Sequence, residues 1–413
     1  MKKIGFHYYS DTDHFQRKDL NRWLPEWKAL DVSWLLIQAP LTRAVPEFFL
    51  RTLGEEGIEP VLQFKLPLGK APEGDDLELL FESYARWGVN YVVLFDRPNV
   101  RSSWGTESWA QSDLVERFLD SYLPAAQEAL TRGLRPVFPP LEPGGDYWDT
   151  MFLRAGLEGL KRRAPAFLLE RLVLSACANG QGRPLDWGVG GPERWPEVQP
   201  YLTPEGGEDQ RGFRIADWYL TLSEAVLEQR LPVMMFDLGG STPPEEDPLE
   251  RTLNMVQLLE ENEVEGSERL PSEILCGMFS LVDEKESGDE APDDGWFHGP
   301  GQPKPVVDAY LSLRGKKEAK GPGEFQLKHY LLLPTYDWGV ADWHLEVTRA
   351  YIKRYRPTVG FSLQEARRAE EVTVVGGGDH FSEEDLNQLR AKGSVVRRVA
   401  GNGTDIAAQL AAI

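Results

Sequence analysis

Short apolar runs alternate with amphipathic stretches along about the first 315 residues of this 413-residue chain. The apolar runs are rich in β-branched and aromatic residues and stop at Gly, Pro or charged residues, as buried parallel strands do. Strands that alternate with helices form parallel sheets. Eight such units in one domain of this length predict the α/β class and a (β/α)8 TIM barrel. The predicted strands are residues 3–9, 32–38, 59–64, 91–95, 135–138, 172–177, 232–236 and 274–279, and the predicted helices include 46–55, 76–87, 112–132, 148–163, 212–229 and 248–260.

A second domain is predicted after the barrel of residues 1–315. Beyond Leu313 the chain is charged and carries Gly and Pro, which indicates a linker over residues 316–326. The alternation then restarts, so residues 327–413 are expected to form a small three-layer α/β domain. Its predicted strands are 329–333, 371–375 and 394–399, and its predicted helices are 342–355, 382–392 and 404–412.

The net charge of −21 argues against two classes of partner. Nucleic acids and anionic membranes would repel such a chain unless a basic patch were segregated, and the sequence contains none. No apolar run reaches the roughly 18 residues of a membrane span. The N-terminus leads directly into the first predicted strand without a secretory leader. We therefore expect a soluble protein, cytoplasmic as the sequence stands and extracellular if a leader has been removed.

Neither a metal nor a cofactor is expected. The six His residues are scattered singly and do not join Cys in a zinc-binding spacing. The acidic stretch 283–294 does not follow the calcium-loop spacing, because Lys285 is its third residue and Ala291 its ninth. We interpret it as a solvated loop. Cys177 and Cys276 lie in two predicted strands and are expected to be buried free thiols.

Two of the predicted strands end in motifs that suggest chemistry. Strand 91–95 stops at the segment 96–99, Asp-Arg-Pro-Asn, and strand 232–236 stops at the segment 237–240, Asp-Leu-Gly-Gly. These ends resemble those of the clan A (cellulase-like) glycoside hydrolases. In that family the fourth strand ends in Asn-Glu-Pro, with the Glu as acid/base catalyst, and the seventh ends in the nucleophile Glu. The resemblance implies a carbohydrate ligand in a cleft at the carboxyl ends of the strands.

Both motifs depart from the family at the catalytic residue. Asp237 stands at the nucleophile position, and its side chain is shorter than Glu by one methylene, about 1.5 Å. Arg97 stands at the acid/base position, and a guanidinium cannot hand a proton to a leaving alkoxide near neutral pH. Asp96 occupies the position of an Asn that contacts the sugar. If the chain hydrolyses glycans, Asp237 is the expected carboxylate, with Glu142 after the fifth strand as its partner.

The eighth strand-helix unit extends the resemblance. Strand 274–279 is followed by Trp296 in a long loop and then by Lys304 and Pro305 before a helix, as in the closing unit of the family. The family usually has a Trp at the end of this strand, which floors the sugar site, and this chain has Phe279 or Ser280 there.

The candidate binding residues follow the predicted strands or lie in the long loops after strands six and eight. Carboxyl ends of barrel strands share one face, so these side chains are expected to meet there. Exposed aromatic residues in the loops suggest stacking on sugars, and packing of the loops onto the rim is the alternative. The predicted substrate-binding residues are His7, Tyr8, Gln38, Lys65, Asp96, Arg97, Asn99, Asn179, Trp187 and Trp296.

Three hypotheses of function follow. The first is a glycoside hydrolase-type protein that recognises, and if active hydrolyses, a glycan. The second is a degenerate hydrolase, a pseudoenzyme retained for glycan binding or assembly. The third is a structural subunit that makes protein contacts through its C-terminal domain. Residues 373–408 also resemble one copy of the bacterial cell-wall-binding repeats of the second type.

Overall fold

The chain folds into two compact units, Met1–Leu311 and Ser312–Ile413, which we describe separately. They are seen in a computed structural model. The structure describes residues 3–69, 74–105, 109–110, 112–198, 209–260, 264, 266–283, 294–320, 327–336, 341–391 and 394–411. The acidic segment 284–293, Tyr201 and the end of the predicted linker, residues 321–326, lie outside the described residues.

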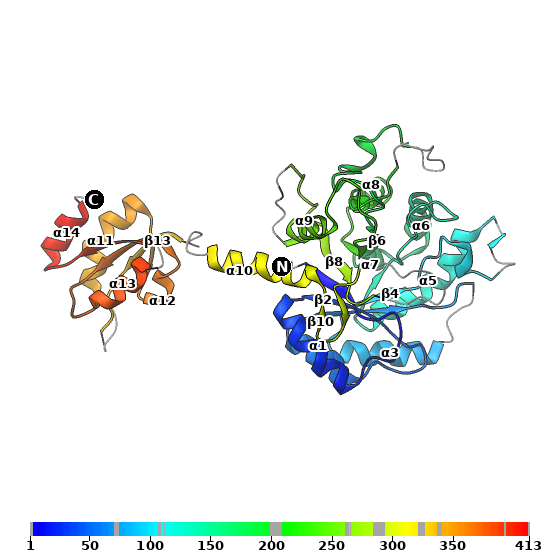
Figure 1. The fold of residues 1–413 in the computed structure, drawn as a ribbon, viewed down its shortest axis with the longest axis horizontal. Coiled ribbons are helices and arrows are strands. Elements are labelled where there is room, and N and C mark those ends of the chain that lie inside the picture. Colours follow the sequence, from blue (N-terminus) through cyan, green and yellow to red (C-terminus); the bar gives the residue numbers. More distant parts are fainter. Residues whose placement is uncertain are drawn as a thin grey trace. The chain divides into compact units, whose positions relative to one another are not determined.

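The first unit is a parallel eight-stranded barrel, as predicted (Figure 1). Its strand order is β5-β4-β3-β2-β1-β8-β7-β6, and all neighbouring strands run parallel. A parallel bridge between Val137 and Val173 joins the two edge strands, so the barrel is nearly closed. The strands are β1 (Ile4–His7), β2 (Trp34–Gln38), β3 (Glu59–Phe64), β4 (Tyr91–Leu94), β5 (Arg135–Val137), β6 (Leu174–Cys177), β7 (Val233–Leu238) and β8 (Ile274–Ser280).

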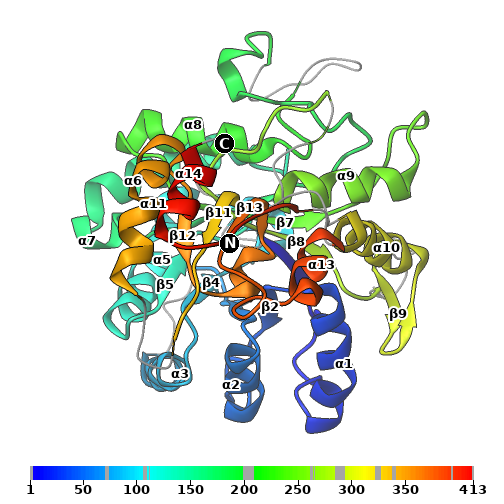
Figure 2. The ribbon, with the colours of Figure 1, turned by 90° about the vertical axis from the view of Figure 1, so that its left-hand side faces the viewer.

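Helices surround these strands (Figure 2). They follow the strands in the chain, which is the connectivity that parallel pairing requires. A short antiparallel pair, β9 (Phe297–Gly299) and β10 (Gln302–Pro303), precedes the last helix. The helices are α1 (Arg17–Leu30), α2 (Glu47–Glu55), α3 (Gly74–Arg86), η1 (Arg101–Ser103), α5 (Leu114–Thr131), α6 (Asp149–Arg163), α7 (Ala166–Leu169), η2 (Gly191–Glu193), α8 (Ile215–Leu227), α9 (Pro248–Glu260) and α10 (Pro305–Lys320).

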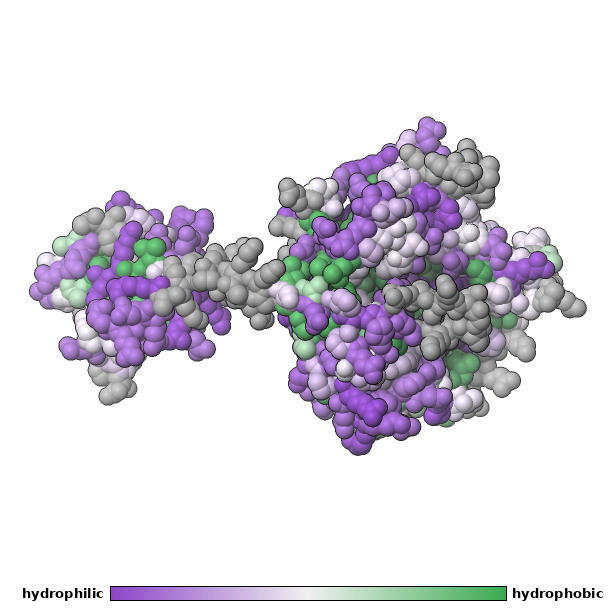
Figure 3. All heavy atoms as spheres, viewed as in Figure 1, coloured by the Kyte–Doolittle hydropathy of each residue, from purple (hydrophilic) through white to green (hydrophobic). Residues whose placement is uncertain are grey.

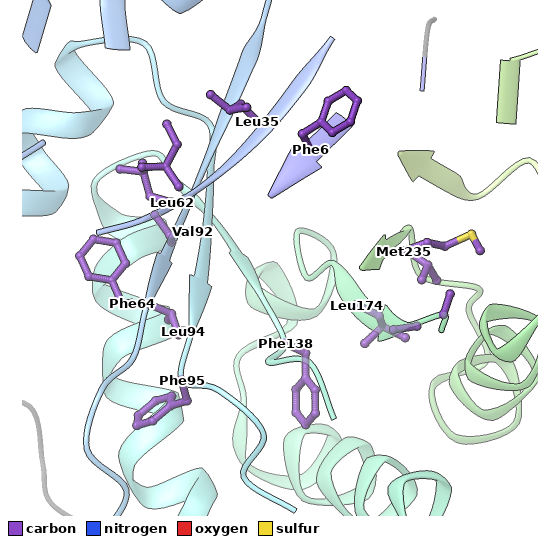
Figure 4. Packing of buried hydrophobic residues seen from close by; sticks show 14 of the residues in the cluster. Phe6, Leu35, Leu62, Phe64, Val92, Leu94, Phe95, Phe138, Leu174 and Met235 are labelled. Atoms are coloured by element: carbon purple, nitrogen blue, oxygen red, sulfur yellow. The ribbon is translucent and has the colours of Figure 1, made fainter. Parts of the chain in front are cut away.

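Alternate residues of each strand face opposite sides of the barrel wall. One set fills the barrel interior with apolar side chains. The other set, of which Figure 4 shows part, packs against the helices. Trp34 and Leu36 of β2 face inward, for example, whereas Leu35 and Ile37 face the helices. Continuing the inward positions towards the carboxyl end of a strand leads to the residues at the mouth of the barrel.

The second unit is a smaller α/β domain with a four-stranded parallel sheet of order β12-β11-β13-β14. The strand β12 was not among the three predicted strands, because it has only three residues. Two apolar clusters lie on opposite faces of the sheet, which gives the predicted three layers. The elements are β11 (Leu327–Leu332), α11 (Asp342–Tyr355), β12 (Thr358–Gly360), α12 (Leu363–Ala366), β13 (Ala369–Val375), α13 (Glu383–Ala391), β14 (Val395–Val399) and α14 (Gly403–Ala411).

Both units present a mostly hydrophilic surface in the view of Figure 3. Within the part of the chain that the structure describes, no helix is long and apolar enough to cross a membrane. Among the same residues, no group of three or more His, Cys, Asp or Glu side chains could hold a metal ion. Cys177 and Cys276 are buried free thiols, as expected. Helix α10 extends to Lys320 and so includes part of the predicted linker; protein contacts through the second unit stay a prediction.

Candidate functional site

A pocket of about 330 Å³ opens at the carboxyl ends of the barrel strands. Each of the eight strands contributes a side chain to it, either from its last residues or from the loop that follows. Of the twelve predicted site residues, eight line this pocket: His7, Gln38, Lys65, Asp96, Arg97, Glu142, Asn179 and Asp237.

A distortion of β7 turns Asp237 into the pocket. The pairing of β7 with β8 shifts register between Met235 and Leu238, which is the signature of a β-bulge. Asp237 adopts a left-handed backbone, with φ of 54°. Its N–H donates to Nε2 of His7 at 3.1 Å. Without the bulge, Asp237 would alternate with Phe236 and face the helices; with it, both residues line the pocket.

The end of β4 is distorted in the same way. Phe95 has φ of 70° and Arg97 has φ of 40°, both in the left-handed region. Regular alternation after Val93 would aim Phe95 into the barrel. Its ring instead packs outward (Figure 4), and its centroid lies 5.7 Å from that of the Phe118 ring. The backbone N–H of Arg97 donates to the carbonyl of Pro140 at 3.0 Å, which ties this end to the loop after β5. Strained backbone of this kind gathers at functional sites.

Arg97 joins the two predicted catalytic carboxylates. Its Nη2 lies 3.0 Å from Oδ2 of Asp237, and its Nε lies 3.1 Å from Oε2 of Glu142. All three side chains are partly exposed, with relative exposures between 33% and 41%. The guanidinium therefore occupies the place between the carboxylates while the pocket around it stays open.

The surroundings of Asp237 keep it ionised. Burial acts to raise the pKa of Asp237, but His7 and Arg97 outweigh burial, so this pKa lies below its ordinary value. Burial raises the pKa of Cys177 well above its ordinary value, so Cys177 remains a thiol and donates a hydrogen bond to Asp237. Burial acts to lower the pKa of Arg97, and the anionic groups around it raise the pKa overall. Arg97 is therefore a permanent cation.

Asn99 does not line the pocket, and this part of the prediction is wrong. Asn99 is fully buried. Its Nδ2 donates to the carbonyls of Glu142 at 2.8 Å and Tyr147 at 3.0 Å, and its Oδ1 accepts from the N–H of Glu142 at 2.8 Å. Asn99 therefore holds the backbone that carries Glu142, which is a positioning role.

Buried Asp149 also fixes the loop after β5 that carries Glu142. Its Oδ1 accepts from the N–H of Gly144 at 2.9 Å and from Nε2 of Gln210 at 2.6 Å, and its Oδ2 accepts from the hydroxyl of Tyr219 at 3.3 Å. Burial raises the pKa of Asp149 to about 6, against the opposing effect of these hydrogen bonds. This role could not be predicted from the residue pattern, because Asp149 also starts a helix, where Asp is common.

Three further predicted binding residues lie elsewhere. Tyr8 is buried against Trp27, because its position alternates with His7 and faces the helices. Trp187 is half-buried in the loop after β6, where it contacts Trp195 and donates to the carbonyl of Asp209. Trp296 is only 1% exposed. Its ring packs against Phe6, Phe279 and Tyr310.

Several pocket residues were missed. Gln63 lines the pocket and was detectable, since it shares the inward positions of Lys65 on β3. Asp294 also lines the pocket, at the end of the acidic stretch that we interpreted as a solvated loop. No strand or helix period marks this residue, so its position depends on tertiary packing.

No protein-family model and no curated protein matches this chain. Among solved structures, an endo-β-1,3-glucanase of glycoside hydrolase family 128 from Sorangium cellulosum has 16% identity and a TM-score of 0.39 over 75% of this chain and 96% of that one. A Bacteroides uniformis β-glucuronidase has 10% identity and a TM-score of 0.48 over 82% and 38%. An exo-β-1,4-mannosidase from Opitutaceae bacterium strain TAV5 has 11% identity and a TM-score of 0.40 over 98% and 78%. Values this low do not extend those activities to this chain.

Proposed function

We propose that the barrel is a glycoside hydrolase-type protein that binds a carbohydrate in the pocket at the carboxyl ends of its strands. The observation that carries this proposal is the ionised Asp237, held by His7 and Arg97 at the centre of a polar pocket to which all eight strands contribute. Carboxyl ends of barrel strands are where such folds bind their ligands.

The chemistry of the lining suits a sugar. Carbohydrates present hydroxyl groups that need both donors and acceptors, and the pocket offers the ammonium of Lys65 and the carboxylates of Asp96 and Glu142. Tyr9 adds a half-buried aromatic ring at the same face. A volume of about 330 Å³ lies at the small end of the range for ligand sites, which suits a short glycan or the end of a chain.

One observation favours the second candidate, a pseudoenzyme that binds a glycan without cleaving it. Arg97 forms ion pairs with both Asp237 and Glu142. A guanidinium cannot act as the general acid, and it favours the ionised form of a carboxylate beside it. Both predicted catalytic carboxylates are thus engaged by a group that cannot donate a proton to the leaving oxygen.

An oligosaccharide array followed by calorimetric titration tests the binding proposal. We expect saturable binding of at least one glycan, weakened at least about tenfold in Asp237→Asn, since loss of one charge-assisted hydrogen bond costs about 1.5 to 3 kcal/mol. The control is Glu170→Gln, an exposed carboxylate at the opposite end of the barrel, which should bind as the wild type does. An array without any bound glycan, or equal losses in both variants, would contradict the proposal.

A further inference from the structure

Asp294 stands at the rim of the pocket on a firmly anchored segment. The N–H of Trp296 donates to the carbonyl of Ser280 at 3.1 Å, and the N–H of Phe297 donates to the carbonyl of Leu281 at 2.9 Å. The chain after Asp294 therefore runs alongside the end of β8. The buried ring of Trp296, which sequence reasoning assigned to sugar binding, instead fixes this segment to the barrel core.

The carboxyl group of Asp294 lies close to the turn that follows Asp237. A Cβ placed on Gly239 would be 3.5 Å from Oδ2 of Asp294, and both Asp residues line the same pocket. Ser280 contributes a side-chain hydrogen bond to Asp294. Burial raises the pKa of Asp294, and the charges of Asp283 and Asp237 add to this rise, whereas the pKa of Asp237 is lowered.

The two acidic neighbours of Asp294, Asp283 and Asp237, have cationic or titratable partners of their own. Asp283 forms an ion pair with Lys304, whose Nζ lies 2.6 Å away, and Nδ1 of His298 lies 3.4 Å from its other oxygen. The cationic and titratable groups that face these two neighbours of Asp294 include Lys304 and His298 at Asp283, and Arg97, His7 and Cys177 at Asp237.

We propose that Asp294 donates the proton that Arg97 cannot, and that it works with Asp237 to cleave a glycosidic bond. This inference rests on the proposed function of the pocket as a glycan site. Carboxyl groups whose environments drive their proton affinities apart are the usual acid and anion of such a reaction. Asp294 lines the open pocket and has a raised pKa, and Asp237 is an anion held by the cation of Arg97.

The reaction balances with water alone. One oxygen of Asp237 bonds to the anomeric carbon while the bond to the leaving oxygen breaks, and that oxygen takes its electron pair and the proton of Asp294. Water then displaces Asp237 from the anomeric carbon; its hydroxyl stays on the sugar and its proton returns to Asp294. Arg97 does not react. Its charge keeps Asp237 ionised, which suits a nucleophile better than a base.

The first experiment needs no substrate. With 13C-labelled Asp, the side-chain carboxyl signals of the full chain are followed against pH and assigned with Asp294→Asn and Asp237→Asn. We expect Asp294 to titrate at higher pH than Asp237, and its midpoint to fall when the charge of Asp237 is removed. A midpoint for Asp294 at or below that of Asp237 would overturn the proposal.

The second experiment measures cleavage of a panel of 4-nitrophenyl and benzyl glycosides of common hexoses, pentoses and hexuronic acids in both anomeric forms. General acids contribute about 10²- to 10⁴-fold, and most where the leaving group is poor. We expect Asp294→Asn to lose at least about 100-fold on the benzyl glycoside and less than tenfold on the nitrophenyl one. The fall in rate at alkaline pH should vanish in the variant. Asp186→Asn, an exposed carboxylate on the same barrel unit, is the matched control.

Each remaining outcome is decisive. Equal losses on both glycosides would overturn the role of Asp294 as an acid, because a merely structural role does not depend on the leaving group. Saturable glycan binding without cleavage anywhere in the panel would overturn the inference and leave the binding proposal intact. If the chain neither binds nor cleaves any glycan tested, both the inference and the proposed function are wrong.

Discussion

Left-handed residues serve different purposes at the two ends of the barrel. At the amino end, three turns into strands use glycine, Gly57, Gly88 and Gly133, with φ of 77°, 91° and 90°. A Cβ on any of them would meet nothing within 4 Å, so backbone conformation alone calls for glycine there. Asp31 and Glu228 also adopt the left-handed conformation at this end, where each ends a helix. The carboxyl end combines the left-handed glycines Gly239 and Gly240 with left-handed residues that carry side chains: Phe95, Arg97, Gln181 and Asp237.

The difference between the two ends lies in what the left-handed residues with side chains do. A left-handed residue with a side chain costs about 1 to 2 kcal/mol, which glycine would avoid. The carboxyl end tolerates that cost because the strained positions deliver Arg97 and Asp237 to the pocket. Pocket volume does not single out the carboxyl end as the functional end, because a pocket at the amino end is larger, about 870 Å³ against about 330 Å³.

The largest expected effect separates two Asn residues at opposite ends. Asn99→Ala leaves the backbone groups of Glu142 and Tyr147 without partners, and it should lower the free energy of unfolding by about 3 to 4 kcal/mol. Asn90→Ala, at the amino end, removes hydrogen bonds to Glu59 near solvent and should cost about 1 kcal/mol or less. Urea unfolding measures both. Similar losses would show that Asn99 does not hold the pocket.

The next effect concerns pH. The pKa of Asp149 is raised to about 6 in the folded protein from 3.8, so the folded state binds this proton more tightly and the free energy of unfolding falls as pH rises between these values. The loss reaches about 2 to 3 kcal/mol and is complete above pH 6. Asp149→Asn removes this dependence.

The measurement is urea unfolding at several pH values between 4 and 7. The stability of Asp149→Asn relative to the wild type should rise across this range, whereas that of Glu170→Gln at the amino end should not change. A constant difference between Asp149→Asn and the wild type would show that the buried carboxyl group does not titrate in this range.

The smallest expected effect compares two nearby glycines at the amino end of the barrel, Gly57 and Gly54. Gly57→Ala forces a side chain into φ of 77° and should destabilise the protein by about 1 kcal/mol. Gly54→Ala, inside α2 and open to solvent, should stabilise it by about 0.5 to 1 kcal/mol through helix propensity. Thermal unfolding gives both signs. A stabilising Gly57→Ala would show that this turn at the amino end does not require glycine.

Much of the barrel and part of the site could be predicted, for one physical reason. Strand period and burial are local, so β3 was predicted with its exact bounds, and His7, Gln38 and Lys65 fall on the inward positions of their strands. The same period, applied strictly, would have placed Tyr8 against the helices and Tyr9 in the pocket. The short β12 was missed because three residues carry too little periodicity.

The sequence alone determined the parallel barrel, the α/β class of the second unit and the departure of Arg97 from a proton-donating residue. Only the tertiary structure decided what surrounds these positions. The bulge at Asp237 and the left-handed backbone of Phe95 break the strand period. Asn99, predicted to contact the ligand, instead hydrogen-bonds the backbone that carries Glu142. Asp294 lines the pocket from a loop that has no helix or strand period. The amino-acid sequence determines which charged and reactive groups a side chain carries. The proton affinity and the partners of that side chain depend on residues that are distant in the sequence.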